Sequence, residues 1–222
     1  MPSTLTGVRD ALNRRGIRAC RSPKKDRTAG SGGGSSGHTE SASGKVEMAE
    51  RLILLYSRDE IARRVRELAA VISAEYADKD LVLVGILRGA FVFLADLIRH
   101  LTIPAAVDFI GAASYGSRSR TSGQIQITKE LQIPIGGRDV LLVEDIEDAG
   151  ITLQGILERV KQQKPRSLKV CALIDKKERR RVDVKVDYVG FEIPRGFIVG
   201  YGIDYAERFR HLPEIYRIEG IE

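Results

Sequence analysis

Short apolar segments that alternate with helical patterns constrain the fold of this chain most strongly. Residues 81–87, 139–143 and 168–174 are mainly apolar runs of the kind found in strands buried on both faces of a sheet. Residues 61–76, before the first run, and residues 153–160, between the second and third, have apolar side chains at helical spacing. Strands that alternate with helices predict an α/β fold, a mainly parallel twisted sheet with flanking helices.

The remaining elements extend the same pattern. Apolar spacing predicts a helix over residues 90–101, and Ser57 or Asp59 is available to cap the helix that precedes the first buried strand. Four further strands are predicted, at residues 105–110, 123–128, 188–193 and 197–203.

The N-terminal segment differs in composition from the rest. The net charge is +6, yet the first 50 residues alone have nine Lys/Arg and five Asp/Glu. Residues 30–44 are rich in Gly and Ser and have almost no apolar side chain, which predicts a flexible linker. The spacing of Gly32, Gly34 and Gly37 fits a dinucleotide loop formally, but no strand precedes it. We therefore predict a disordered basic tail and linker over residues 1–47 and one domain over residues 48–222.

Three interpretations of the tail remain open. Residues 8–18 are basic and have the length of a short helix, so a targeting peptide is one of them, although Asp10 argues against it. A disordered tail is the second. The third is that translation starts at Met48.

Composition excludes several classes of function. No apolar run is long enough to cross a bilayer, so we expect no membrane partner. The histidines share no zinc motif, and Cys20 and Cys171 are unsuited to a structural disulfide. Because most of the excess positive charge lies in the tail, we expect no nucleic-acid partner for the folded part. A cytoplasmic enzyme is the expected class.

One acidic loop has the chemistry of a binding site. In open α/β sheets, ligands bind beyond the carboxyl ends of the strands, where acids and then small residues follow residue 143 here. Clustered acids repel one another unless a cation or a hydroxyl-rich ligand offsets them, and a helix N-terminus favours an anion. This combination suits a sugar phosphate, whereas an ordinary acidic helix cap is the alternative. The loop reads Glu144-Asp145-Ile146-Glu147-Asp148-Ala149-Gly150-Ile151-Thr152.

This loop resembles the phosphoribosyl pyrophosphate motif of type I phosphoribosyltransferases, and the domain resembles their hypoxanthine-guanine branch. Further segments match that family's pyrophosphate loop, lid, purine-reading lysine and base-binding hood. They are Leu87-Arg88-Gly89-Ala90, Ser114-Tyr115-Gly116, Leu173-Ile174-Asp175-Lys176, Val189-Gly190-Phe191 and Gly200-Tyr201-Gly202-Ile203-Asp204-Tyr205. The resemblance implies the family's fold with a small hood.

The resemblance implies a role for each residue of the acidic loop. Glu144 and Asp145 would hold the ribose hydroxyls, around which Mg²⁺ binds. Asp148 would be the acid/base group at purine N7. Residues 148–152, which include Ala149, Gly150 and Ile151 and the Thr152 hydroxyl, would bind the 5′-phosphate.

Roles for the other segments follow in the same way. Arg88, Gly89 and Arg210 would bind pyrophosphate, and a cis peptide is expected between Leu87 and Arg88. Lys176 would donate to O6 of the purine, Tyr188 would stack on the ring, and Val189 would offer its backbone. Ser114 and Tyr115 would form the tip of a lid, although the composition of residues 114–122 fits an exposed hairpin loop equally well.

Some positions depart from the family pattern. Ala149 lacks the hydroxyl that usually meets the 5′-phosphate, and Ile151 replaces a polar residue. Arg195 stands where the family usually has an aspartate for a second metal ion. We consider two readings equally: Arg195 replaces that ion as a fixed positive charge, or it extends into solvent and has no role.

We therefore expect a purine-salvage enzyme that transfers phosphoribosyl from phosphoribosyl pyrophosphate to hypoxanthine or guanine, giving IMP or GMP and pyrophosphate. Mg²⁺ is the expected cofactor. The resemblance also implies a homo-oligomer, a dimer or tetramer. The alternative is a catalytically weak relative that binds nucleotides and regulates another process.

Overall fold

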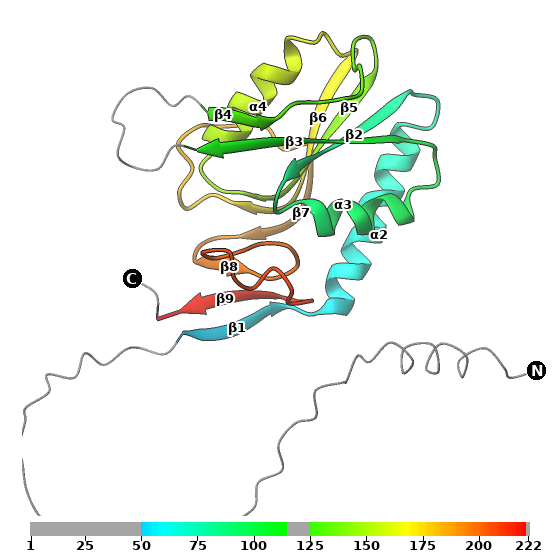
Figure 1. Cartoon of the computed structure of the whole chain (residues 1–222). Helices are drawn as coiled ribbons and strands as arrows, with labels where there is room; N and C mark the ends of the chain where they lie inside the picture. The colour runs from blue at the N-terminus through cyan, green and yellow to red at the C-terminus, as the bar shows by residue number, and fades with distance from the viewer. Residues whose placement is uncertain (1–49, 115–124, 221–222) are drawn as a thin grey trace, which may run out of the picture. The chain divides into compact units, whose positions relative to one another are not determined.

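The computed structural model describes residues 50–114 and 125–220, and its main feature is a six-stranded sheet (Figure 1). The strand order is β4-β3-β2-β5-β6-β7, and every neighbouring pair is parallel except β3 with β4. The predicted α/β class, a mainly parallel sheet with flanking helices, is confirmed. The strands are β2 (Leu81–Leu87), β3 (Ala106–Ser114), β4 (Ile125–Lys129), β5 (Asp139–Glu147), β6 (Ser167–Lys176) and β7 (Tyr188–Ile193).

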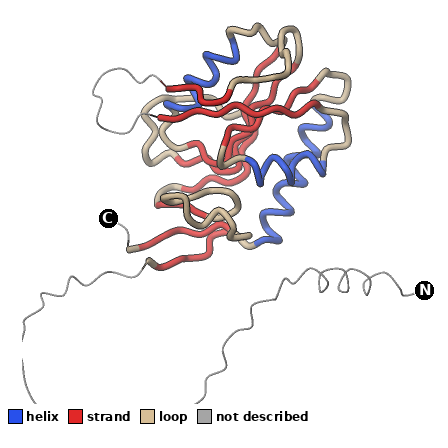
Figure 2. The backbone as a smooth tube through the Cα atoms, viewed as in Figure 1, coloured by secondary structure: helices blue, strands red, loops and turns tan. Residues whose placement is uncertain are grey.

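Helices cover both faces of this sheet, as Figure 2 shows. Successive side chains of a strand point to opposite faces, so β2 contributes Leu81 and Leu83 to one core and Val82 and Val84 to the other. The first core also contains side chains of α2 and α3, and the second contains those of α4. This arrangement explains why the central strands are apolar throughout. The helices are α2 (Arg58–Glu75), α3 (Phe91–His100) and α4 (Ile151–Lys161).

Helix α2 begins where the sequence predicts. Ser57 is its N-cap: the Ser57 hydroxyl accepts from the Glu60 backbone N–H at 3.4 Å, and the Glu60 carboxylate accepts from the Ser57 N–H at 2.8 Å. This reciprocal pair satisfies two backbone donors that have no partner within the helix.

A second, smaller sheet has the strand order β1-β9-β8. It consists of β1 (Arg51–Tyr56), β8 (Phe197–Val199) and β9 (Ile215–Glu219), all antiparallel. We call it the hood. The predicted strand over residues 197–203 is too long, because Gly200 and Tyr201 have positive φ angles and turn the chain after Val199. Strands β1 and β9 were not predicted.

Strands β5 and β6 extend further than the sequence indicated. Parallel pairing continues through Glu144 with Ala172 and Glu147 with Asp175, so three of the clustered acids belong to the strand itself. In the described residues, no helix is long and apolar enough to span a membrane. The predicted tail and linker lie outside those residues.

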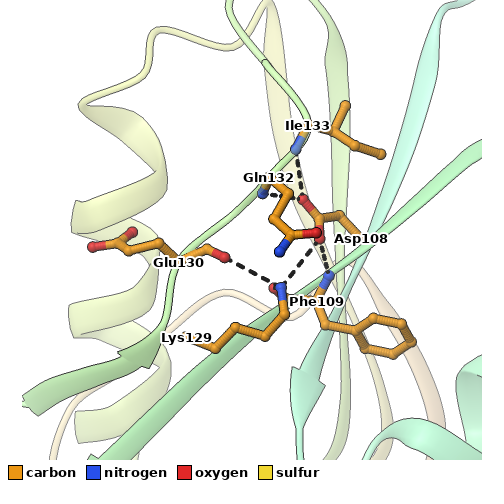
Figure 3. A network of polar contacts seen from close by, with 6 residues as sticks. All are labelled: Asp108, Phe109, Lys129, Glu130, Gln132 and Ile133. Carbon is orange, nitrogen blue, oxygen red and sulfur yellow. Dashed lines mark hydrogen bonds and ion pairs between the residues drawn. The ribbon is translucent and has the colours of Figure 1, made fainter.

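Asp108 on β3 anchors the chain that follows β4 (Figure 3). Its carboxylate is 5% exposed and accepts hydrogen bonds from the backbone N–H groups of Phe109, Gln132 and Ile133 at 2.6–2.8 Å. The Lys129 ammonium lies 3.3 Å from the same carboxylate. Burial acts to raise the pKa of Asp108, but these donors outweigh it and lower the pKa.

We predict that Asp108→Asn lowers the free energy of unfolding by about 2–4 kcal/mol, because an amide places its own donor against a backbone donor. The depressed pKa of Asp108 means that its contribution is present above the ordinary Asp pKa and is lost as the pH falls through the folded value. Urea unfolding at neutral and acid pH measures both effects. The exposed Asp78→Asn is the control, and equal stability of the two variants would contradict the prediction.

Candidate functional site

The site lies at the carboxyl ends of β2 and β5. A cavity of about 250 Å³ opens there. Its walls bring together most of the residues predicted to contact the sugar phosphate and pyrophosphate, together with Asp204, which was not predicted. The predicted lining residues are Arg88, Gly89, Glu144, Asp145, Thr152 and Arg210.

The segment after β2 reaches this cavity because it has no side chain at Gly89. A Cβ atom there would lie 1.7 Å from Asp145 Oδ2, so only glycine allows the two segments to approach. The peptide bond between Leu87 and Arg88 is cis, as expected from the resemblance.

The turn from β5 into α4 depends on a second glycine. Gly150 has a φ angle of 83°, and a Cβ atom there would lie 2.1 Å from the Val182 carbonyl oxygen. Helix α4 begins at Ile151, so Thr152 lies in its first turn, where N–H groups have no intrahelical partner. This turn therefore offers donors to an anion.

Burial changes the charge balance of the acids on β5. Glu144 and Asp145 are each 8% exposed and Glu147 is 3% exposed. Burial, then the hydrogen bond and charge of Asp145, raises the pKa of Glu144 well above its usual value. Burial also raises the pKa of Glu147 to about 7, although the Arg180 guanidinium opposes that shift.

A second group of charged residues lies at the end of β6. The Lys176 ammonium is 3% exposed and lies 3.1 Å from Asp148 Oδ2 and 3.1 Å from the Gly196 carbonyl oxygen, to which it donates. Asp148 Oδ1 is buried, and the described part of the chain offers it no hydrogen-bond partner. A buried polar atom of this kind needs a ligand or water as its partner.

Comparison with known proteins decides the family. The model of the phosphoribosyl transferase domain matches residues 55–206. The chain belongs to the phosphoribosyltransferase family. The match spans the sheet, the acidic strand end and the first strand of the hood that follows β7.

Named relatives lie in one branch of the phosphoribosyltransferases. The hypoxanthine-guanine phosphoribosyltransferase of Aquifex aeolicus is 47% identical over 77% of this chain and 96% of its own length. The hypoxanthine phosphoribosyltransferase of Escherichia coli K12 is 49% identical over 72% of this chain and 90% of its own. A crystal structure of a hypoxanthine-guanine phosphoribosyltransferase from Bacillus anthracis has a TM-score of 0.72 and 41% identity. The similarity covers 77% of this chain and 99% of the chain in that crystal structure.

Two predicted purine contacts lie at the wrong end of this phosphoribosyltransferase's sheet. Tyr188 and Val189 begin β7, whereas Ile193 at its other end pairs with Lys176. The Tyr188 ring is buried in the core with its hydroxyl on Glu75. The prediction that Tyr188 stacks on the base and Val189 offers its backbone is therefore corrected.

Phe197 is the aromatic residue near Lys176. It follows Gly196, whose carbonyl accepts from Lys176, and the Arg179 guanidinium lies 4.5 Å from the centre of its ring. The sequence interpretation missed Phe197 because it begins a strand and resembles a core residue. The sequence signal that could have indicated its role is its position at the start of a strand, directly after Gly196.

Of the two readings of Arg195, its position favours the one in which it extends into solvent. Arg195 is exposed and lines a separate recess with Leu55, Tyr56 and Arg217, rather than the cavity beside Asp145. The acid that lines that cavity from the hood side is Asp204, 2.6 Å from the Arg210 guanidinium. Because the chain turns between Arg195 and Asp204, the expected change of charge does not lie at this cavity.

Arg88 and Arg210 meet at one side chain. Both form ion pairs with the Glu207 carboxylate. The two arginines predicted to bind pyrophosphate therefore both pair with one carboxylate of the protein itself. Of the two residues predicted at the tip of a lid, Ser114 is the last residue of β3, and Tyr115 lies outside the described residues.

The acids fit a metal ion that is shared with a substrate. Within residues 50–114 and 125–220, no three His, Cys, Asp or Glu side chains are arranged to hold a metal. Glu144 and Asp145 make no ion pair with a Lys or Arg there, whereas Asp148 and Glu147 do. Mg²⁺ commonly binds one or two carboxylates together with substrate oxygens, and this pair offers the carboxylates.

We predict that Glu147→Gln makes stability less dependent on pH. A folded pKa of about 7, above the ordinary 4.5, means that the contribution of Glu147 is fully present below 4.5 and is lost as the pH rises to about 7. Relative to wild type, the variant should therefore gain about 1–3 kcal/mol of unfolding free energy between pH 5 and pH 8. Urea unfolding at both values measures this. The exposed Glu158→Gln is the control, and a parallel change in the two variants would refute the assignment.

Proposed function

We propose that this phosphoribosyltransferase acts in purine salvage and transfers phosphoribosyl from phosphoribosyl pyrophosphate to hypoxanthine or guanine. The observation that carries the proposal is the buried pair of Lys176 and Asp148, 3.1 Å apart, next to the cavity of Glu144 and Asp145. The names of the relatives support the same substrates.

Lys176 accounts for selection of the base. An ammonium group only donates hydrogen bonds, so it complements the O6 carbonyl of a 6-oxopurine. Adenine presents a donor at the same position and would leave two donors facing each other. Phe197, at the start of β8, supplies an apolar face on which the purine ring stacks.

Asp148 accounts for proton transfer. Purine N9 attacks C1′ of the ribose, the bond from C1′ to the pyrophosphate oxygen breaks, and the N7 proton passes to the Asp148 carboxylate. Pyrophosphate leaves with the bonding electrons. The unpartnered Asp148 Oδ1 is the atom available to receive that proton.

The cavity residues account for binding of the sugar phosphate. Glu144 and Asp145 accept hydrogen bonds from the ribose hydroxyls, and with substrate oxygens they would hold Mg²⁺, which neutralises the leaving group when bound. The backbone of residues 148–152 and the Thr152 hydroxyl bind the 5′-phosphate, and Ala149 contributes its backbone alone because it has no hydroxyl. Arg88, the Gly89 segment and Arg210 bind pyrophosphate, which displaces Glu207 from the two arginines.

The test is a spectrophotometric assay with phosphoribosyl pyrophosphate, Mg²⁺ and each of hypoxanthine, guanine, xanthine and adenine. Turnover of hypoxanthine or guanine without adenine supports the proposal. Absence of turnover for all four bases, combined with tight IMP or GMP binding, would instead favour a nucleotide-binding regulator.

We predict that Asp148→Asn lowers kcat by about 10²-fold or more, the usual contribution of a general acid/base group, with a smaller change in KM. Asparagine keeps the shape but cannot accept the N7 proton. Steady-state kinetics measures both constants. Asp183 is an exposed acid in the loop between β6 and β7, and its variant Asp183→Asn should retain wild-type kinetics. Near-normal turnover by Asp148→Asn would remove Asp148 from the chemistry.

The domain boundary is part of this proposal. We place the complete catalytic domain at residues 48–222 and treat residues 1–47 as a basic tail and linker. Pairing of β1 with β9, and stacking of Tyr56 on Phe191 with their ring centres 3.9 Å apart, supports a domain that needs β1.

We further propose that the protein acts in the cytoplasm and as a homo-oligomer. The exposed Val71, Phe91 and Ile98 on α2 and α3 support the latter, which light scattering tests.

We predict that a chain starting at Met48 keeps wild-type activity and thermal stability, because Gly/Ser-rich segments make few native contacts. A chain starting at Ser57 lacks β1 and should lose stability, since β9 then has an unpaired edge. Activity and melting temperature of the two chains decide the boundary. A large loss on removal of residues 1–47 alone would contradict it.

A further inference from the structure

Arg180 contacts both residues that the proposed function places at the purine. Its Nε donates to the main-chain carbonyl oxygen of Asp148 at 3.2 Å. Its Nη2 donates to the Asp175 carboxylate and, at 3.4 Å, to the Lys176 carbonyl oxygen. The Arg180 side chain is 15% exposed, so these contacts are largely shielded from water.

The location of Arg180 also resolves a charge conflict. Glu147 and Asp175 are partners in the parallel register of β5 and β6, and both are buried. Like charges directly opposite each other destabilise a sheet. Arg180 lies 3.8 Å from Glu147 Oε1 and also pairs with Asp175, which holds its guanidinium between the two strand ends.

The residues after Arg180 fix the same turn. The backbone N–H groups of Arg181 and Val182 both donate to the Ala149 carbonyl oxygen, at 3.0 and 3.2 Å. The Arg180 side chain therefore completes a set of contacts between residues 180–182 and residues 148–149. Within the described chain, the Asp148 carboxylate itself contacts one cation, Lys176, so its place depends on its main chain.

We propose that Arg180 is a positioning residue that sets the spacing of Asp148 and Lys176 by linking their main chains through one guanidinium. The inference rests on the proposed function, since it assigns those two residues to the base. A planar guanidinium presents several donors in a fixed geometry and so spans the two strand ends, whereas a lysine ammonium is a single point charge. Charge neutralisation alone and positioning therefore predict different results for Arg180→Lys.

The experiment compares Arg180→Lys, Arg180→Ala and Arg181→Met in the full-length chain. Arg181→Met is the matched control, because it removes the same charge from an exposed neighbour that makes no side-chain ion pair with the described residues. We expect Arg180→Lys to lower kcat for hypoxanthine by about 10–10²-fold, the cost of a misplaced catalytic group, while KM for phosphoribosyl pyrophosphate changes much less. Millimolar guanidinium ion should restore part of the turnover of Arg180→Ala and none of that of Arg180→Lys.

Wild type and Arg181→Met decide the proposed function separately: if neither turns over hypoxanthine or guanine, that function fails whatever Arg180 does. With both active, wild-type kcat in Arg180→Lys would show that Arg180 only neutralises charge and would overturn the proposal. Equal losses in kcat and in IMP affinity, or guanidinium rescue of melting temperature without rescue of turnover, would also overturn it. Failure of both Arg180 variants to fold would show a role in the fold and count against positioning.

Discussion

Repulsion among acids at the end of one buried strand is the constraint on which the site depends. β5 ends with Glu144, Asp145 and Glu147, all buried, and Asp148 follows directly. Burial of carboxylates is costly unless cations or hydrogen-bond donors compensate for the lost water. The fold compensates half of the cluster with its own residues, because Lys176 pairs with Asp148 and Arg180 with Glu147.

The other half of the cluster is left for a ligand. Glu144 and Asp145 lie at the cavity and make no ion pair within the described residues, and the pKa of Glu144 is raised by its burial. In the proposed function, protein cations therefore hold the acids beside the base, whereas the acids beside the sugar are left to bind hydroxyls and a metal ion. This division explains how one short strand end supports both halves of a phosphoribosyl transfer.

The hood completes the site from sequence positions that are distant from the acidic loop. Its segments bring Phe197 and Gly196 to Lys176, and the loop before β9 brings Asp204 and Arg210 to the cavity. Gly202 allows this closure, because a Cβ atom there would lie 2.5 Å from the Gly89 carbonyl oxygen. Gly89 in turn allows Asp145 to approach from the sheet. Because neither glycine has a side chain, three segments of the backbone meet around one cavity.

Local sequence determined the α/β class, the two candidate caps Ser57 and Asp59, the main strands and the loop of acids and small residues, because each depends on neighbours within a few positions. The α/β pattern placed Glu144 and Asp145 beyond the carboxyl end of a strand, and the family resemblance assigned Lys176 to the same site. The family resemblance, matched to short segments, misplaced Tyr188, Val189 and Arg195. It also gave no role to Phe197, Asp204 or Arg180. Only the tertiary structure decided these, because the end of β7 that faces the site and the turns after Val199 are set by contacts between residues far apart in sequence. A strand's apolar pattern indicates burial equally at both of its ends, so it does not distinguish a tyrosine of the core from a phenylalanine at the edge of a cavity.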